Sequence, residues 1–241
     1  MLKFFRNIRY KFIEEGRFIN YLKYAIGEIF LVVIGILIAV SINNWNENRK
    51  QQQLFLTILK NIEDDMKSDT LVFYQTKDNF RKGDSIFKRI LDNKMTREDY
   101  INCERCANII NAHAPLNFKS KGFEMLKGYV DNQNETKDSL ASDILMFYSQ
   151  VTDLSQIINE HIKNDVSGNL KYSKENHAWF YLNHEQRIKN EDFLNYVVNS
   201  TDFKNRVAMQ RILVVKNLKS ILDTFNKNAK ILLPRIEARL N

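Results

Sequence analysis

Two cysteines, Cys103 and Cys106, have the clearest chemical potential in this sequence, and they lie three residues apart in "CERC". Thiols at this spacing can form a local disulfide, act as a redox pair or supply half of a zinc site. A zinc site needs two further ligands, and only His113 lies nearby. A thioredoxin-type pair needs a βαβ frame, which the surrounding sequence does not indicate. Three states of the two cysteines therefore remain open: a disulfide, two ordinary thiols and a metal site. The metal site is the least favoured of them, so we predict no bound metal or cofactor.

The rest of the chain lacks the signatures of familiar enzymes. It has no P-loop, no GxSxG, no HExxH and no glycine-rich phosphate loop. His177 and His184 flank "AWFYLN" and are predicted to be structural. Basic residues in the later part of the chain alternate with acidic ones, unlike a nucleic-acid-binding patch. We therefore predict a non-enzymatic protein that binds no nucleic acid, and a periplasmic enzyme is the least favoured class.

Glu28 is the one acid in a strongly apolar run, "YAIGEIFLVVIGILIAVSINNW", at 24–45. About 20 apolar residues are enough for a helix to cross the roughly 30 Å of bilayer hydrocarbon. Tyr24 stands at one end and Trp45 at the other, as in the aromatic belts of membrane helices. The run predicts a single transmembrane helix over 23–45. The alternatives are a core helix of a soluble protein and a cleaved signal peptide.

The orientation of this helix is predicted from the basic residues on its two sides. Six precede or open it and three follow it closely: Lys3, Arg6, Arg9, Lys11, Arg17 and Lys23 against Arg49, Lys50 and Lys60. The positive-inside rule then places the N-terminus in the cytoplasm. Residues 46–241 are predicted to lie on the far side, which is the periplasm if the membrane is a bacterial inner membrane.

The first 22 residues predict a second membrane element. Apolar residues recur at roughly helical spacing at Leu2, Phe5, Ile8, Phe12 and Ile19. Four basic residues occupy other angles of the same helix: Lys3, Arg6, Arg9 and Lys11. This pattern is typical of an amphipathic helix that lies on acidic lipid head groups. The alternative is a frayed basic tail.

Small residues share one face of the predicted span with Glu28. At about 100° per residue, Gly35 and Ala39 lie within about 20° of Glu28, and Val32 lies within about 40°. Gly35 and Ala39 also form a small-xxx-small step, which lets two helix backbones approach closely. We predict that this face contacts another membrane helix, from a second copy or from a membrane-protein partner. The alternative is that the Glu28 side chain reaches the nearby interface.

The N-terminal run resembles an uncharacterised family of single-span proteins from Bacteroidota, especially flavobacteria. The resemblance rests on the order YAIGEI, LVVIGILIA and INNWNE, present here at 24–29, 31–39 and 42–47. It is looser in "FKSKGFEMLKGYVDN" at 118–132 and fades elsewhere. The resemblance implies a bacterial envelope protein and carries no activity.

The remainder, 46–241, has helical periodicity throughout. Apolar residues recur every three or four positions over 55–73, 140–158 and 203–232, and "TRED" at 96–99 is typical of a helix start. "DVSGN" at 165–169 predicts a break after the second pattern, and Pro234 predicts a kink near the end of the third. We therefore predict an all-α fold, with the amphipathic and transmembrane helices followed by an antiparallel bundle. Its predicted function is partner binding or sensing, or else service as an accessory subunit of a larger inner-membrane complex.

Overall fold

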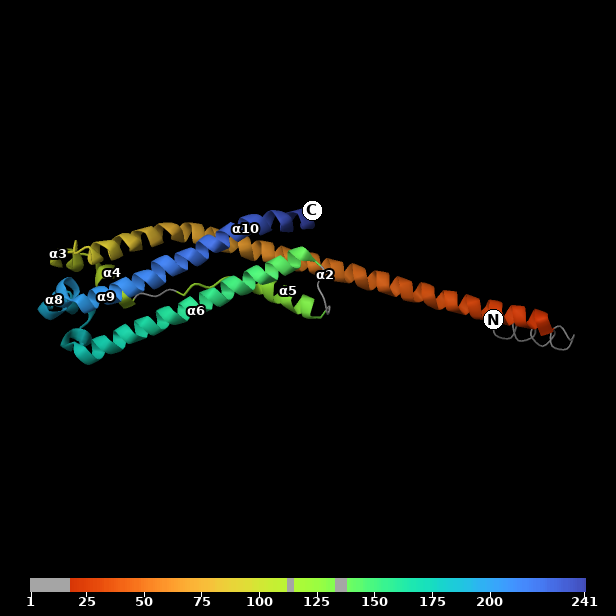
Figure 1. The fold of residues 1–241 in the computed structure, drawn as a ribbon, viewed down its shortest axis with the longest axis horizontal. Coiled ribbons are helices and arrows are strands. Elements are labelled where there is room, and N and C mark those ends of the chain that lie inside the picture. Colours follow the sequence, from red (N-terminus) through yellow and green to blue (C-terminus); the bar gives the residue numbers. More distant parts are fainter. Residues whose placement is uncertain (1–17, 112–114, 133–137) are drawn as a thin grey trace. The chain divides into compact units, whose positions relative to one another are not determined.

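The computed structural model describes residues 18–111, 115–132 and 138–241, and Figure 1 shows their arrangement. These residues form helices joined by short turns, with no strand among them, so the predicted all-α class is confirmed. The helices are α2 (Phe18–Leu91), α3 (Arg97–Ile101), α4 (Glu104–Ala107), η1 (Ile109–Asn111), α5 (Lys121–Asp131), α6 (Ser139–Asn176), η2 (Ala178–Tyr181), α7 (His184–Arg187), α8 (Glu191–Asn199), α9 (Thr201–Gln210), η3 (Arg211–Asn217) and α10 (Leu218–Leu240).

The chain divides into two units, Met1–Phe55 and Leu56–Asn241. In the first unit, none of residues 22–55 of α2 is buried, and every residue from 29 to 50 is exposed. The second unit has a hydrophobic core built from the rest of α2 and from all the later helices except α7. The second unit therefore gains folding free energy from a core of its own.

Helices α6 and α10 lie side by side in the second unit, and α5 packs on α6 (Figure 1). Four phenylalanines from separate segments meet between them: Phe73 of α2, Phe118 before α5, Phe147 of α6 and Phe225 of α10. The Phe225 ring centroid lies 4.9 to 5.3 Å from the other three. Aromatic pairs at such distances contribute about 0.5–1.5 kcal/mol each beyond the area they bury.

The predicted break at 165–169 is wrong, because α6 continues through it to Asn176. An interior glycine costs a helix only about 1 kcal/mol relative to alanine. Asn169, next to Gly168, is 2 % exposed and donates from Nδ2 to the carbonyl oxygen of Ile110 at 3.0 Å. Burial and hydrogen bonds beyond the glycine therefore outweigh its intrinsic preference.

The third predicted helical pattern is present, but a π-helical segment interrupts it. Helix α9 passes into η3, a π-helix of 7 residues, and then into α10, which continues beyond Pro234. Most of its apolar positions are buried: Phe203, Val207, Leu218, Ile221, Phe225, Ala229 and Leu232. The wider turns of η3 shift the register between the two halves of this pattern.

Candidate functional site

The apolar run of α2 is the first candidate site. It makes α2 the one helix, among those described, that is long and apolar enough to cross a membrane. On the face predicted to contact another helix, Glu28 is half-buried, whereas Val32, Gly35 and Ala39 are exposed. The predicted lipid-binding residues Lys3, Arg6, Arg9 and Lys11 lie outside the described residues. An exposed apolar surface of this extent indicates contact with lipid or with other apolar helices.

The glycines of this run have free space around them. A Cβ atom built on Gly27 or on Gly35 would have no neighbouring atom within 4 Å, apart from its own stretch of helix. A larger side chain at either position therefore meets no clash within the described chain. A difference between the effects of one substitution at these two positions then points to contact with another molecule, because the intrinsic helix preference changes equally at both.

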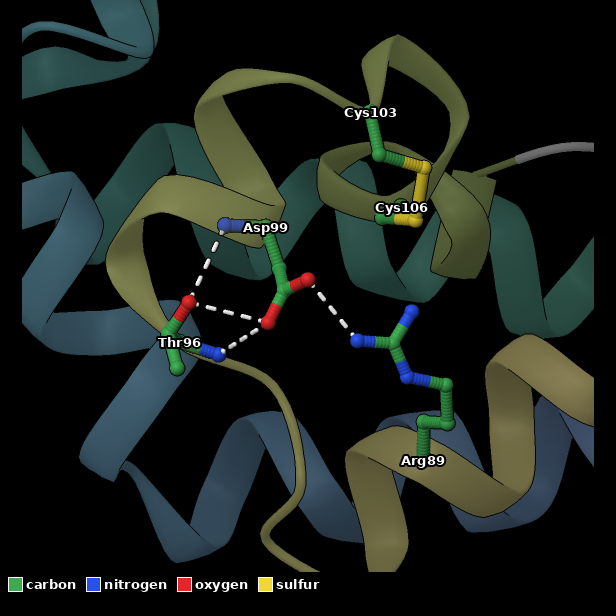
Figure 2. Close-up of a disulfide and its surroundings, with 5 residues drawn as sticks. All are labelled: Arg89, Thr96, Asp99, Cys103 and Cys106. Atoms are coloured by element: carbon green, nitrogen blue, oxygen red, sulfur yellow. Dashed lines mark hydrogen bonds and ion pairs between the residues drawn. A yellow bond between two sulfur atoms is a disulfide. The ribbon is translucent and has the colours of Figure 1, made fainter.

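The second candidate site is the cysteine motif, where Cys103 and Cys106 form a disulfide with Cα atoms 5.3 Å apart (Figure 2). Cys103 is the N-cap residue of α4 and is half-exposed, whereas Cys106 is 2 % exposed and belongs to the core cluster around Trp179 and Phe203. His113, the further ligand considered for a metal site, lies outside the described residues. Within those residues, no group of three or more His, Cys, Asp or Glu side chains could hold a metal ion.

A hydrogen-bonded turn lies beside this disulfide. Thr96 caps α3, as "TRED" predicted: its side chain accepts from the Asp99 amide, and the Asp99 carboxylate accepts from the Thr96 amide at 2.8 Å. Arg89 at the end of α2 also donates to Asp99 at 2.8 Å (Figure 2). These interactions, led by the Thr96 amide, lower the pKa of Asp99 to about 2. The Asp99 carboxylate is therefore ionised at neutral pH, where it links the segment that carries the cysteines to α2.

We expect the disulfide to contribute moderately to stability. It closes a loop of only four residues, for which the chain-entropy model gives about 2 kcal/mol. The double variant Cys103→Ser, Cys106→Ala of the full chain in mild detergent should therefore melt roughly 4–8 °C lower than the wild type, followed by circular dichroism at 222 nm. The reduced wild type should have the same melting temperature as the variant. Unchanged melting after both treatments would contradict this prediction.

The third candidate site joins α2 to the start of α5 through two carboxylates. Asp65 Oδ2 accepts from the Gly122 amide at 2.8 Å, and Asp69 Oδ2 accepts from the Lys119 amide at 2.8 Å. Gly122 lies in the first turn of α5, whose first amides have no partner within the helix, so the Asp65 carboxylate satisfies its amide and also complements the helix dipole. Asp69 is 4 % exposed, and this burial raises its pKa to about 6.

Gly122 allows this approach of the two helices. A Cβ atom at this position would lie 2.5 Å from the Ile62 backbone nitrogen and 2.8 Å from the Ile62 Cα atom. The position therefore has no room for a side chain. No sequence pattern indicates that Asp65, Asp69 and Gly122 meet, although the resemblance around 118–132 covers the α5 side of this contact.

A fourth polar cluster links α9 to α6. The Arg206 guanidinium donates to both Asp202 oxygens, at 2.7 and 3.0 Å, and to Asn169 Oδ1 at 2.9 Å. Its Cζ atom lies 3.8 Å from the centre of the Tyr172 ring, a cation–π contact. These contacts give the half-buried Arg206 cation its partners. One partner, Asn169, is 37 residues away in the sequence, which is too far for a local pattern to predict.

His177 and His184, which flank "AWFYLN", have different surroundings. His177 stacks on Trp179, with ring centroids 4.6 Å apart, and lies 4.3 Å from the Tyr196 ring. Burial among these rings lowers the pKa of His177. His184 opens α7, whose N-cap is Asn183. Neither histidine belongs to a group that could hold a metal ion among the residues that the structure describes.

Comparison with known proteins decides the family. The sequence model of DUF6090, a family of unknown function, matches residues 28–201. The chain belongs to this family. No curated protein and no solved structure matches it. The DUF6090 match covers the apolar run from Glu28 onward, the disulfide and the carboxylate contact at α5, and it ends at the first residue of α9.

Proposed function

We propose that this DUF6090 protein is a non-enzymatic, single-pass inner-membrane protein whose helical second unit binds a partner or senses a signal. The observation that carries the proposal is the exposed apolar run in α2, which is followed in the chain by a unit with its own core. Residues 23–45 are the transmembrane helix, and 1–22 lie on the cytoplasmic lipid surface. Residues 46–241 form an antiparallel bundle in the periplasm of a Bacteroidota cell.

The span is also the first proposed contact with a partner. Gly35 and Ala39 are exposed and leave room for a second backbone to approach, as small-xxx-small faces do. Hydrogen bonds between membrane helices contribute only about 0.6 kcal/mol on average, so close packing at Gly35 is the larger contribution. We assign this face, with Glu28 and Val32, to self-association of the span.

We expect Gly35→Ile to weaken self-association of the span by on the order of tenfold, or about 1.4 kcal/mol, in a membrane two-hybrid assay. A branched side chain at the contact keeps the two backbones apart. Gly27→Ile is the matched control, because Gly27 has equal free space and lies about 100° from Glu28 around the helix. Glu28→Gln should have a smaller effect than Gly35→Ile. Equal effects of the two glycine variants would reject this face.

Reporter fusions test the topology. A reporter enzyme that works only in the periplasm should be active when fused after Asn241, and one that works only in the cytoplasm should be inactive there. The opposite pattern would overturn the proposed orientation without affecting the helix contact.

A further inference from the structure

A groove in the second unit has no role in the function proposed above. It has a volume of about 590 Å³ and follows η3 and the first half of α10 beside Asp84 of α2. Its charged lining residues are Asp84, Arg211, Lys216, Lys219, Asp223 and Lys227. This volume lies within the range of about 300–1,000 Å³ that is typical of ligand pockets.

Both acids of the groove already have cationic partners. Asp84 Oδ1 accepts from Arg211 Nε at 2.7 Å, and Asp84 Oδ2 pairs with Lys88 Nζ at 2.7 Å. The hydrogen bond from Arg211 is the main cause that lowers the pKa of Asp84. Asp223 Oδ2 pairs with Lys219 Nζ at 3.1 Å. Neither carboxylate is therefore available to neutralise a further lysine.

Lys216 and Lys227 remain as cations of the groove without a counter-ion. Neither makes an ion pair with any residue that the structure describes, and both are exposed. Two ammonium groups along one groove, with both neighbouring acids occupied, attract an anionic ligand. The groove therefore has a net positive potential that its own side chains do not cancel.

The π-helix lies at one end of the same groove. Three lining residues, Arg211, Val215 and Lys216, belong to η3. A π-helical turn is less favourable than an α-helical turn, and such turns occur frequently at functional sites. Lys216 thus belongs to the π-helix and also lacks an ion pair among the described residues. This observation does not depend on the shape of the groove.

The spacing of the two lysines restricts the ligand. Lys216 and Lys227 are 11 residues apart on one helical path, which corresponds to roughly 16 Å at 1.5 Å per residue. An extended peptide rises about 3.3 Å per residue and alternates its side chains between two faces, so carboxylates on one face lie an even number of residues apart. Six residues span about 20 Å, which the long lysine side chains at the two ends can reach. The hydroxyls of Ser220 and Thr224 line the groove between the two ends, where they can bond to a peptide backbone.

We propose that this groove binds an extended acidic peptide segment, with carboxylates at Lys216 and Lys227. Charge complementarity fixes the sign of the ligand, and the separation of the lysines fixes its length. A single small anion satisfies only one of the two ends.

The test uses the full chain in neutral-detergent micelles and the fluorescein-labelled peptide Glu-Gly-Ser-Gly-Ser-Gly-Glu, at about 50 mM salt to limit screening. Binding is followed by fluorescence anisotropy. Lys216→Gln with Lys227→Gln should weaken binding by about tenfold or more, which is about 1.4 kcal/mol. The matched control, Lys163→Gln with Lys171→Gln, removes two exposed lysines of α6 that have no ion pair among the described residues. It should remain within about twofold of the wild type.

Several outcomes would overturn the proposal. One is the absence of binding to the wild type, and another is an equal loss in both double variants, which would reflect net charge alone. Inorganic phosphate that competes as well as the unlabelled peptide would show a small-anion site instead. A peptide with its two glutamates adjacent should bind more weakly, and equal binding would reject the two-ended contact. Matching melting curves of the two double variants show that folding is not the cause.

Discussion

Gly122→Ala should destabilise the second unit by about 2–4 kcal/mol, which is large for the addition of one methyl group. The new Cβ atom would lie 2.5 Å from the backbone nitrogen and 2.6 Å from Cγ1 of Ile62. Because backbone atoms of α2 cannot rotate away, α5 must move from α2. That movement also weakens the hydrogen bond from the Gly122 amide to Asp65, which is 2.8 Å long.

The measurement is the melting temperature of the full chain in mild detergent, which should fall by roughly 10 °C. Two other helical glycines provide matched controls, because a Cβ atom at Gly128 or Gly168 would have no neighbour within 4 Å. Their alanine variants should be about 0.5–1 kcal/mol more stable than the wild type, since alanine is the better helix former. If Gly122→Ala has the same melting temperature as these controls, α5 does not contact α2 as closely as described.

Asp69→Asn should stabilise the protein at pH 8 by up to about 3 kcal/mol and have little effect at pH 4. The pKa of Asp69 is raised to about 6, mainly by burial. Between the pKa of the unfolded chain, about 4, and 6, the folded state binds more protons than the unfolded state. Stability therefore falls as the pH rises through this window, and two pKa units correspond to about 3 kcal/mol. Asparagine avoids this cost because it carries no charge.

Asparagine also retains an oxygen that can accept from the Lys119 amide, so the contact with the start of α5 is preserved. Urea unfolding at several pH values between 4 and 8 measures the difference between variant and wild type. Asp153→Asn, at an exposed position of α6, is the control and should change stability little at any pH. A stability difference for Asp69→Asn that does not grow with pH would contradict the prediction.

The apolar run and the helical class could be predicted because both depend on local composition. The side chains of 29–40 are apolar at every position but the glycine, so any fold must leave them in lipid or bury them. The capping box of Thr96 and Asp99 was also predictable, because its partners are three residues apart. The cysteine spacing allowed a disulfide but did not choose it over free thiols.

The contacts of the second unit depended on the tertiary structure. Asp65 and Asp69 lie more than 45 residues from the amides they bind, and on the sequence alone they look like ordinary exposed acids of an amphipathic helix. The continuation of α6 through Gly168 was missed for the same reason, since the burial of Asn169 against Ile110 comes from a segment 59 residues away.

The sequence by itself determined where an apolar helix forms, where α3 begins and which faces are apolar, because these follow from neighbours within one or two turns. Only the tertiary structure decided that Gly122 has no room for a side chain and that burial raises the pKa of Asp69 to about 6. It also decided where the π-helix η3 lines the groove with Lys216 and Lys227. Each of these properties arises where helices distant in sequence exclude water and one another's atoms, and local patterns do not record such contacts.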